Sequence, residues 1–295
     1  MITNININTL ILTIIILLTF SKQQICIINY NIIQKLNTNI NAKRIISMSP
    51  SISEILFKLN LDQKIVGVTK FCNKITIIKQ KTTIGGLIDP QLEIILSLKP
   101  DLIITPPSSS IYSFIKELEN KNINIIFGYI ETMHEIFECI LKIGNVTEKN
   151  NLAQKILKCC KKNIKYFKNS LITKNSSLVN ILLIVSVNEI IVAGHNTFAA
   201  NLVKYMGANY QANKSYNTWP ILTIEKLLRN TPDIIIVTQG SVALKQLKIK
   251  LAPVLNLKKF KYCKLLASKN EILTRPGIYI YEDAKIVQTL IDNNR

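Results

Sequence analysis

The chain has 295 residues, of which 48% are hydrophobic and 19% are charged, and its formal net charge is +19. This length suits one large or two ordinary domains, and the composition is that of a globular protein rather than a disordered one. The lysines are scattered along the chain, without an Arg-rich run or interleaved aromatic residues, so the charge does not indicate nucleic-acid binding.

The first 42 residues predict an export signal or membrane anchor followed by a polar, Asn-rich spacer. An apolar stretch at 10–20 has the length of a signal-peptide core and is short for a full membrane span. No basic residue precedes it and no small-x-small cleavage site follows it. Cys26 could carry a lipid, although the residues before it, QQI, are a poor lead-in. The alternative is a buried N-terminal helix of a cytosolic protein.

Residues 43–146 alternate strand patterns with helix patterns, which predicts one α/β lobe. Ser51 and Glu54 have the spacing of a capping box at the start of the first helix. Asp89 is expected to cap a later helix that has Pro90 at its first position. Strands are expected at 44–49, 64–68, 101–105 and 122–127, and helices from 50, from 90, near 109–119 and at about 132–143.

A long helix is predicted at 147–171, where no Gly or Pro interrupts an apolar pattern of helical spacing. At 1.5 Å per residue it would be a rod of about 36 Å, long enough to join two domains. A second α/β lobe, 172–295, follows. Its strands are expected at 177–187 and 233–238, and its helices near 197–206, near 223–229 and after 277.

A helix-to-strand phrase occurs twice: LEIILSLKPDLII returns as IEKLLRNTPDIII. Aligning Glu93 with Glu225 also aligns Asp101 with Asp233. Each Glu falls in the first turn of its helix, where the helix dipole stabilises a carboxylate. Two interpretations are open. The pair only stabilises two helix N-termini, or it forms a docking surface, one carboxylate per lobe, for a partner with two positive sites.

Five segments between residues 44 and 277 carry a family resemblance: RIISMSPSISEILFKLNLDQKIVGVTKFCN, IGGLIDPQLEIILSLKPDLII, VAGHNTFAANLVKYMGA, WPILTIEKLLRNTPDIIIV and RPG. With them the chain resembles a class III periplasmic substrate-binding protein of an ABC importer, closest to the cobalamin-binding branch. The resemblance implies an α/β fold of two Rossmann-like lobes, with central β-sheets flanked by helices, joined by one long backbone helix. It also implies that Glu93 and Glu225 pair with arginines on the two permease subunits.

In that family the ligand lies in the cleft between the lobes, on loops that follow strands. The corresponding positions here are Pro50, Phe71, Gly86, Pro106, Asn188 and Trp219. For Arg275, in the RPG segment, two roles are open: it lines the cleft, or it braces the last helix. Cobalamin binders carry aromatic residues at several of these positions. Phe71 and Trp219 keep this character, whereas the positions near Gly85, Pro106 and Val185 do not. The resemblance implies cobalamin as the ligand, with a ferric siderophore or haem as the alternative.

Metal and catalytic signatures are weak. The two histidines, His134 and His195, are too few for a site that chelates a bare metal ion, and we expect both to be structural or surface residues. The six cysteines include no CxxC pair, so a zinc site is not indicated, and removal of Cys26 with a signal would leave five, which does not indicate a disulfide framework. The sequence contains no GxSxG, P-loop or GxGxxG motif, so an enzyme is not expected.

These observations predict a binding protein without a cofactor or metal site of its own. It is expected to be a monomer, in the periplasm or anchored to the outer face of the cytoplasmic membrane. Its expected partners are a bulky metal-chelate ligand and an ABC permease with its ATPase. The alternative from a different class is a membrane-anchored interaction protein that has lost ligand binding.

Overall fold

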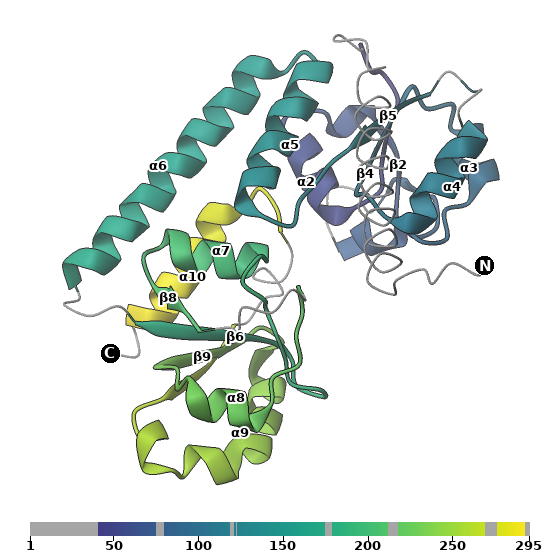
Figure 1. Cartoon of the computed structure of the whole chain (residues 1–295). Helices are drawn as coiled ribbons and strands as arrows, with labels where there is room; N and C mark the ends of the chain where they lie inside the picture. Colours follow the sequence, from purple (N-terminus) through teal and green to yellow (C-terminus); the bar gives the residue numbers. More distant parts are fainter. Residues whose placement is uncertain are drawn as a thin grey trace, which may run out of the picture.

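The computed structural model describes residues 41–74, 80–118, 121, 123–174, 179–211, 218–268 and 276–292. The expected N-terminal export signal and Arg275 lie outside these residues. The described chain forms two α/β lobes, and the long helix α6 (Asn150–Lys174) runs along one side of them (Figure 1). The fold class expected from the sequence is therefore confirmed.

The N-terminal lobe is built on a five-stranded sheet in the order β3-β2-β1-β4-β5, in which every pairing is parallel. Its strands are β1 (Ile45–Ser47), β2 (Ile65–Val68), β3 (Thr82–Thr83), β4 (Leu102–Thr105) and β5 (Asn124–Phe127). Its helices are α2 (Pro50–Lys58), α3 (Leu92–Ser97), α4 (Ser109–Leu118) and α5 (Met133–Val146), with short 3₁₀ turns η1 (Asp62–Lys64) and η2 (Lys70–Lys74).

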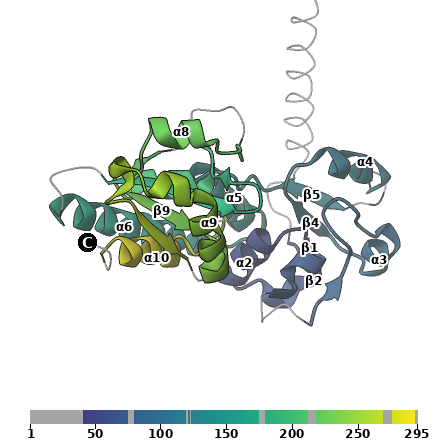
Figure 2. The same ribbon diagram turned by 90° about the horizontal axis from the view of Figure 1, so that it is seen from below.

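Both faces of this sheet are covered, as the apolar strand sequences require. Ile45 packs with residues of α2 and α5 on one face, and Ile46 packs with residues of α3 and α4 on the other. Successive strand residues therefore belong to different cores. Figure 2 shows α3 and α4 at the outer end of the lobe.

The C-terminal lobe repeats this plan. Its sheet has the order β10-β9-β6-β7, with β8 also paired to β6, and only the β6–β7 pairing is antiparallel. Its strands are β6 (Asn180–Ser186), β7 (Ile191–Val192), β8 (Asn209–Tyr210), β9 (Ile234–Val237) and β10 (Lys264–Ala267). Its helices are α7 (Phe198–Tyr205), α8 (Ile224–Arg229), α9 (Gly240–Leu255) and α10 (Ile280–Asp292), with the 3₁₀ turn η4 (Lys258–Phe260). Helix α9 and strand β10 were not among the expected elements.

Two predicted helix caps are wrong, because distant partners take the capping side chains. Helix α2 is capped by Ser49, whose hydroxyl accepts the Ile52 N–H at 3.3 Å, while the Ser51 hydroxyl donates to the Pro276 carbonyl. Helix α3 begins after Gln91. The Asp89 carboxylate instead forms an ion pair with Lys70 at 3.1 Å.

The long helix begins three residues later than predicted. Thr147 ends α5 instead, and its hydroxyl donates to the Ile143 carbonyl at 2.6 Å. Glu148 follows with a positive φ of 60°, which breaks the helical path between α5 and α6. At the corner, Gly144 of α5 lies so close to α6 that an added Cβ would be 2.5 Å from the Ala153 Cβ.

The lobes are joined at more places than α6 alone. One apolar cluster contains buried residues of α2, α5, α6, α7 and α10 and therefore runs from one lobe into the other. Helix α10 lies beside α6 (Figures 1 and 2). The segment before α10 touches α2, because the Lys58 amine lies 4.9 Å from the centre of the Tyr279 ring. The chain thus crosses back to the N-terminal lobe near its end.

Candidate ligand cleft and docking surface

Four candidate ligand residues lie at one edge of the N-terminal sheet. Pro50, Phe71, Gly86 and Pro106 follow β1, β2, β3 and β4, respectively. Because these strands are parallel, their carboxyl ends share one edge, which is where open α/β sheets bind ligands. The topology therefore brings these four positions together on one side of the lobe.

Phe71 and Gly86 are placed by contacts that surround Lys70. The Lys70 N–H donates to the Gly85 carbonyl at 2.9 Å, and its amine pairs with Asp89. The hydrogen bond from the Lys70 amine holds the pKa of the Asp89 carboxyl below its ordinary value, so this carboxylate is charged at neutral pH. The Phe71 side chain is 58% exposed and lies under the Lys70 amine at 5.6 Å from the ring centre. An aromatic face is thus presented beside the Gly85–Asp89 loop.

Gly85 and Gly86 meet different local constraints. The Gly86 N–H donates to the Asp89 carbonyl at 3.3 Å, which closes the loop. A Cβ at Gly86 would lie 2.2 Å from the Asp89 carboxylate oxygen Oδ1, and one at Gly85, where φ is 89°, would lie 2.4 Å from the Asp89 carbonyl oxygen. At Gly85 the positive φ and the Asp89 backbone therefore exclude a larger side chain, whereas at Gly86 the exposed Asp89 carboxylate would have to move aside.

Trp219 lies on a segment that extends the C-terminal sheet. The Val192 N–H donates to the Pro220 carbonyl at 3.0 Å, and the Gly194 N–H donates to the Thr218 carbonyl at 2.8 Å. These bonds flank Trp219 and fix its backbone beside β7. Its side chain remains 45% exposed, which a core tryptophan would not be.

A small cavity of about 80 Å³ lies next to Trp219, between the lobes. It is lined by Glu131, Thr197, Phe198, Ala199, Thr218, Trp219 and Pro276. Pockets for small organic ligands usually occupy about 300–1,000 Å³. A bulky ligand would therefore need the facing loop surfaces of both lobes in addition to this cavity.

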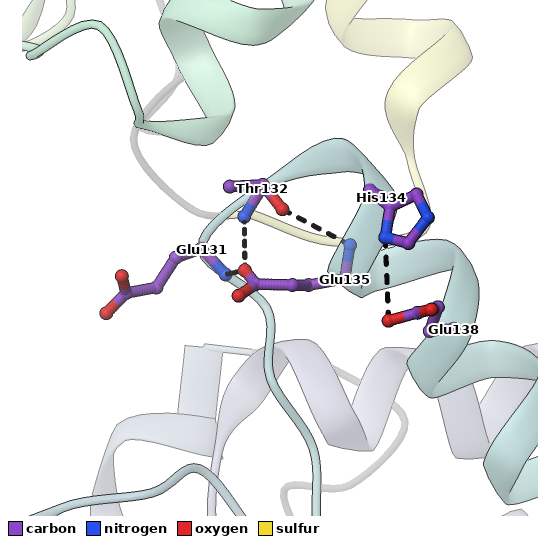
Figure 3. A network of polar contacts seen from close by, with 5 residues as sticks. All are labelled: Glu131, Thr132, His134, Glu135 and Glu138. Carbon is purple, nitrogen blue, oxygen red and sulfur yellow. Dashed lines mark hydrogen bonds and ion pairs between the residues drawn. The ribbon is translucent and has the colours of Figure 1, made fainter. Parts of the chain in front are cut away.

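Glu131 is a cleft residue that was missed at the sequence level. A capping box places it: the Thr132 hydroxyl accepts the Glu135 N–H at 3.2 Å, and the Glu135 carboxylate accepts the Thr132 N–H at 2.8 Å and the Glu131 N–H at 3.0 Å (Figure 3). The Glu131 side chain points away from α5. The Thr-x-x-Glu spacing directly after a buried strand could have indicated this position.

Asn188 and Pro50 do not line this cavity. Asn188 lies in the turn between β6 and β7, where its carbonyl and that of Val187 accept hydrogen bonds from the Lys250 amine of α9. Pro50 begins α2, next to the Ser51 hydroxyl that donates to Pro276. Pro50 thus precedes a residue that is bonded to the cavity lining, whereas Asn188 is at the β6–β7 tip.

The histidines lie in separate places. His134 is on the exposed side of α5, with its Nδ1 3.5 Å from Glu138 (Figure 3), and His195 packs edge-on against the Tyr210 ring. Within the described residues no group of three or more His, Cys, Asp or Glu side chains could hold a metal ion.

The two docking candidates occupy equivalent places. Glu93 is the second residue of the six-residue helix α3, and Glu225 is the second residue of the six-residue helix α8. Both side chains are exposed. Hydrogen bonds from its own N–H and from the Thr223 hydroxyl, with Arg229 nearby, hold the pKa of Glu225 below its ordinary value. Its carboxylate is therefore charged at neutral pH.

The aspartates of the repeated phrase are structurally equivalent as well. The Asp101 carboxylate accepts the backbone N–H groups of Lys43 and Arg44 just before β1, the nearer at 2.7 Å. The Asp233 carboxylate accepts the N–H of Asn180 at the start of β6, also at 2.7 Å. Each aspartate thus ties the strand that follows it, β4 or β9, to the neighbouring parallel strand.

Comparisons with known proteins agree with this architecture. The model of the periplasmic binding protein family matches residues 45–256. The uncharacterized ABC transporter substrate-binding lipoprotein YvrC of Bacillus subtilis is 27% identical over 203 residues, which are 67% of this chain and 64% of that protein, just under two thirds of its length. The vitamin B12-binding protein of Vibrio campbellii is 22% identical over 68% of this chain and 73% of its own.

Solved structures of low sequence identity share the fold. The periplasmic vitamin B12 binding protein BtuF of Vibrio cholerae superposes with a TM-score of 0.71 at 20% identity, covering 86% of this chain and 98% of that one. The periplasmic heme-binding protein RhuT of Roseiflexus superposes with a TM-score of 0.70 at 16% identity, covering 86% and 99%.

These relatives are periplasmic proteins or lipoproteins, in agreement with the location expected from the sequence. They are binding proteins and not enzymes, as expected. In the part of the chain that is described, no helix is both long and apolar enough to cross a membrane. With the family model matched over most of its length, the chain belongs to the periplasmic binding protein family.

Proposed function

We propose that the chain is the substrate-binding component of an ABC importer and that it captures cobalamin between its lobes. It would then deliver this ligand to a membrane permease with its ATPase. The observation that carries the proposal is the position of Trp219, held half-exposed at an interlobe cavity and opposite Glu131 of the other lobe. Phe71, exposed at the ligand edge of the N-terminal sheet, supplies a second aromatic face.

The chemistry of these surfaces suits a large chelate that has a flat ring face and polar groups around its edge. Exposed aromatic faces bind flat ligands through apolar contact, and a few polar groups around them set orientation. Pro50, Gly86, Pro106, Asn188 and Arg275 complete the proposed ligand surface. Since the metal of such a chelate is already coordinated, no protein ligand for it is needed.

Tryptophan fluorescence tests this proposal, because Trp219 is the single tryptophan of the chain. Titration of the full chain with cyanocobalamin is expected to quench its emission at micromolar ligand or below, with a Trp219→Phe variant as the blank. Phe71→Ala is expected to weaken binding about tenfold or more, since an aromatic contact is lost.

Tyr262→Ala is the matched control for Phe71→Ala. Tyr262 is also exposed beneath the amine of the preceding lysine, Lys261, at 5.5 Å, but it lies before β10, at the amino end of its strand. Its loss should leave the affinity unchanged. Quenching by haem or a ferric siderophore but not by cobalamin would reassign the ligand. No response to any of the three would favour an interaction protein without ligand binding.

A further inference from the structure

A second and larger cavity lies away from the cleft, in a groove between α5, α6 and α7. Its volume is about 780 Å³. It is lined by His134, Phe137, Lys161, Ile164, Lys165, Asn201, Lys204 and Tyr205. None of the candidate ligand residues belongs to it, so the groove is separate from the proposed cobalamin surface.

The groove combines an apolar floor with a rim of amines. Phe137, Ile164 and Tyr205 supply apolar surface, and Lys161 and Lys165 approach from α6. The Lys161 amine lies 5.9 Å from the centre of the Phe137 ring. Such a site favours an anion that carries an apolar part.

Lys204 of α7 completes the rim. Its amine donates to the His195 carbonyl at 2.9 Å, which holds it at the groove. The described residues that line the groove include no carboxylate, and the neighbouring Glu138 faces His134 at 3.5 Å. The amines of the rim are thus not neutralised by acids of the lining.

The basic rim continues along α6. This helix contains seven lysines and no acidic residue. At about 100° per residue, Lys155, Lys158, Lys161, Lys162 and Lys165, all exposed, fall within an arc of roughly 120° on the flank that borders the groove. Like charges three or four residues apart destabilise a helix by a few tenths of a kcal/mol per pair. The isolated helix gains nothing from this arrangement.

We propose that the α5–α6–α7 groove and the lysine flank of α6 bind the anionic headgroups of a phospholipid bilayer. Lysines near a membrane surface each contribute about 1 kcal/mol when the lipids are anionic. Tyr166 and Tyr205, 68% and 47% exposed on α6 and α7, are of the type that settles at the water–lipid boundary. An extended flank of about 15 Å along one helix suits a flat anionic surface better than a single acidic side chain.

This surface is distinct from the proposed permease contact. In Figure 1, α6 runs along the upper left of the molecule, away from α3 at the right and α8 at the bottom, which carry Glu93 and Glu225. A molecule held on lipid through α6 would therefore not dock through these glutamates at the same time. The lipid-bound form is a resting form, and its detection needs neither ligand nor permease.

Vesicle co-sedimentation of the full chain tests the proposal. Binding is expected to be stronger to vesicles that contain phosphatidylglycerol than to pure phosphatidylcholine, where the apolar N-terminal stretch contributes without the lysines. This difference is expected to shrink at high salt as surface charges are screened. The triple variant Lys161→Gln, Lys165→Gln, Lys204→Gln is expected to lower the partition coefficient at low salt by about tenfold or more. The apolar N-terminal stretch is common to all variants, so its contribution cancels.

The matched control is Lys245→Gln, Lys248→Gln, Lys258→Gln, which removes the same charge. These exposed lysines lie on or just after α9, which packs on the other face of the C-terminal sheet from α7. The control should retain most of the binding. A second α6 variant, Lys155→Gln, Lys158→Gln, Lys162→Gln, alters only the exposed flank. It tests the proposal independently if the groove variant misfolds, and circular dichroism checks the fold of each variant. Equal losses in the α6 and α9 variants, or equal binding to neutral vesicles, would overturn the proposal. So would α6-dependent binding of an acidic peptide without binding to vesicles.

Discussion

In the repeated phrase the two aspartates, Asp101 and Asp233, bond to the backbone of a neighbouring strand, and the two glutamates are exposed. Both carboxylates accept backbone N–H groups at the start of the neighbouring strand, whereas the matching Glu93 and Glu225 point to solvent. A carboxylate in such a place satisfies strand-end amides that would otherwise lack a partner within the sheet. The aspartates therefore recur because each sheet needs them, whereas the recurrence of the glutamates is not explained by contacts within the sheets.

Removal of either aspartate should destabilise its lobe. Asp101→Ala leaves the N–H groups of Lys43 and Arg44 without this acceptor, and we expect the free energy of unfolding to fall by about 1–3 kcal/mol. Asp233→Ala should have a similar effect through Asn180. Urea unfolding followed by circular dichroism measures both. Asp62→Ala is the control, because the Asp62 carboxylate accepts a bond from the adjacent Gln63 side chain rather than from the backbone of a neighbouring strand, and an equal loss there would contradict the assignment.

At the scale of elements, the corner between α5 and α6 sets how the lobes are held. Gly144 allows α6 to approach α5 closely, and the positive φ of Glu148 turns the chain between them. Helix α6 then packs on α10, which also contacts α7 of the C-terminal lobe. The angle between the lobes therefore depends on contacts at this corner.

Gly144→Ala tests this close packing. The new methyl group would lie 2.5 Å from the Ala153 Cβ, so the helices must separate, and we expect a loss of about 1–3 kcal/mol in unfolding free energy. Adding Ala153→Gly to it removes the clash and should restore part of the loss, although Gly in a helix interior itself costs about 1 kcal/mol. A double-mutant cycle from denaturant unfolding measures the coupling. Additive effects would show that the two positions do not compete for space.

At the scale of the whole molecule, Glu93 and Glu225 place one carboxylate on the outer part of each lobe. A net charge of +19 would repel a partner that carries arginines, so two local negative sites become important for orientation. Both lie at the same position of equivalent helices. This symmetry matches a partner made of two similar subunits.

The double variant Glu93→Ala, Glu225→Ala is expected to abolish uptake while leaving ligand affinity intact. The physical reason is that both carboxylates are exposed and lie outside the cavity at Trp219. Uptake of the ligand in cells and fluorescence titration of the purified variant measure the two effects. Glu117→Ala with Glu282→Ala removes one exposed carboxylate from α4 and one from α10 as a control. Unchanged uptake in the first pair would contradict the docking role.

Much of the architecture could be predicted from the sequence, because buried parallel strands and amphipathic helices leave strong local patterns. The ends of elements were harder. Asp89 and Ser51 look like caps, but Lys70 and Pro276, distant in sequence, take their side chains. Helix α9 was missed because Pro253 lies within it and several of its apolar side chains are exposed, which blurs the periodicity.

For the candidate site too, features with a sequence signal could be predicted, and features that depend on contacts between distant residues could not. Trp219 was placed by family position, and the structure puts it at an interlobe cavity. Glu131 was missed because its place depends on how the lobes face each other, which no local pattern reports. The exclusion of a larger side chain at Gly85 likewise depends on the fold of the Gly85–Asp89 loop onto Lys70.

The return of the chain to the N-terminal lobe has a consequence for synthesis. Ile278, Ala284 and Val287 belong to the apolar cluster that unites the lobes, yet they leave the ribosome after every other buried residue of that cluster. The N-terminal lobe has its complete parallel sheet by Phe127 and can form early, since domains fold as units during translation. The cleft between the lobes therefore acquires its final shape only after α10 has been synthesised, and export of an unfolded chain would postpone that step until after translocation.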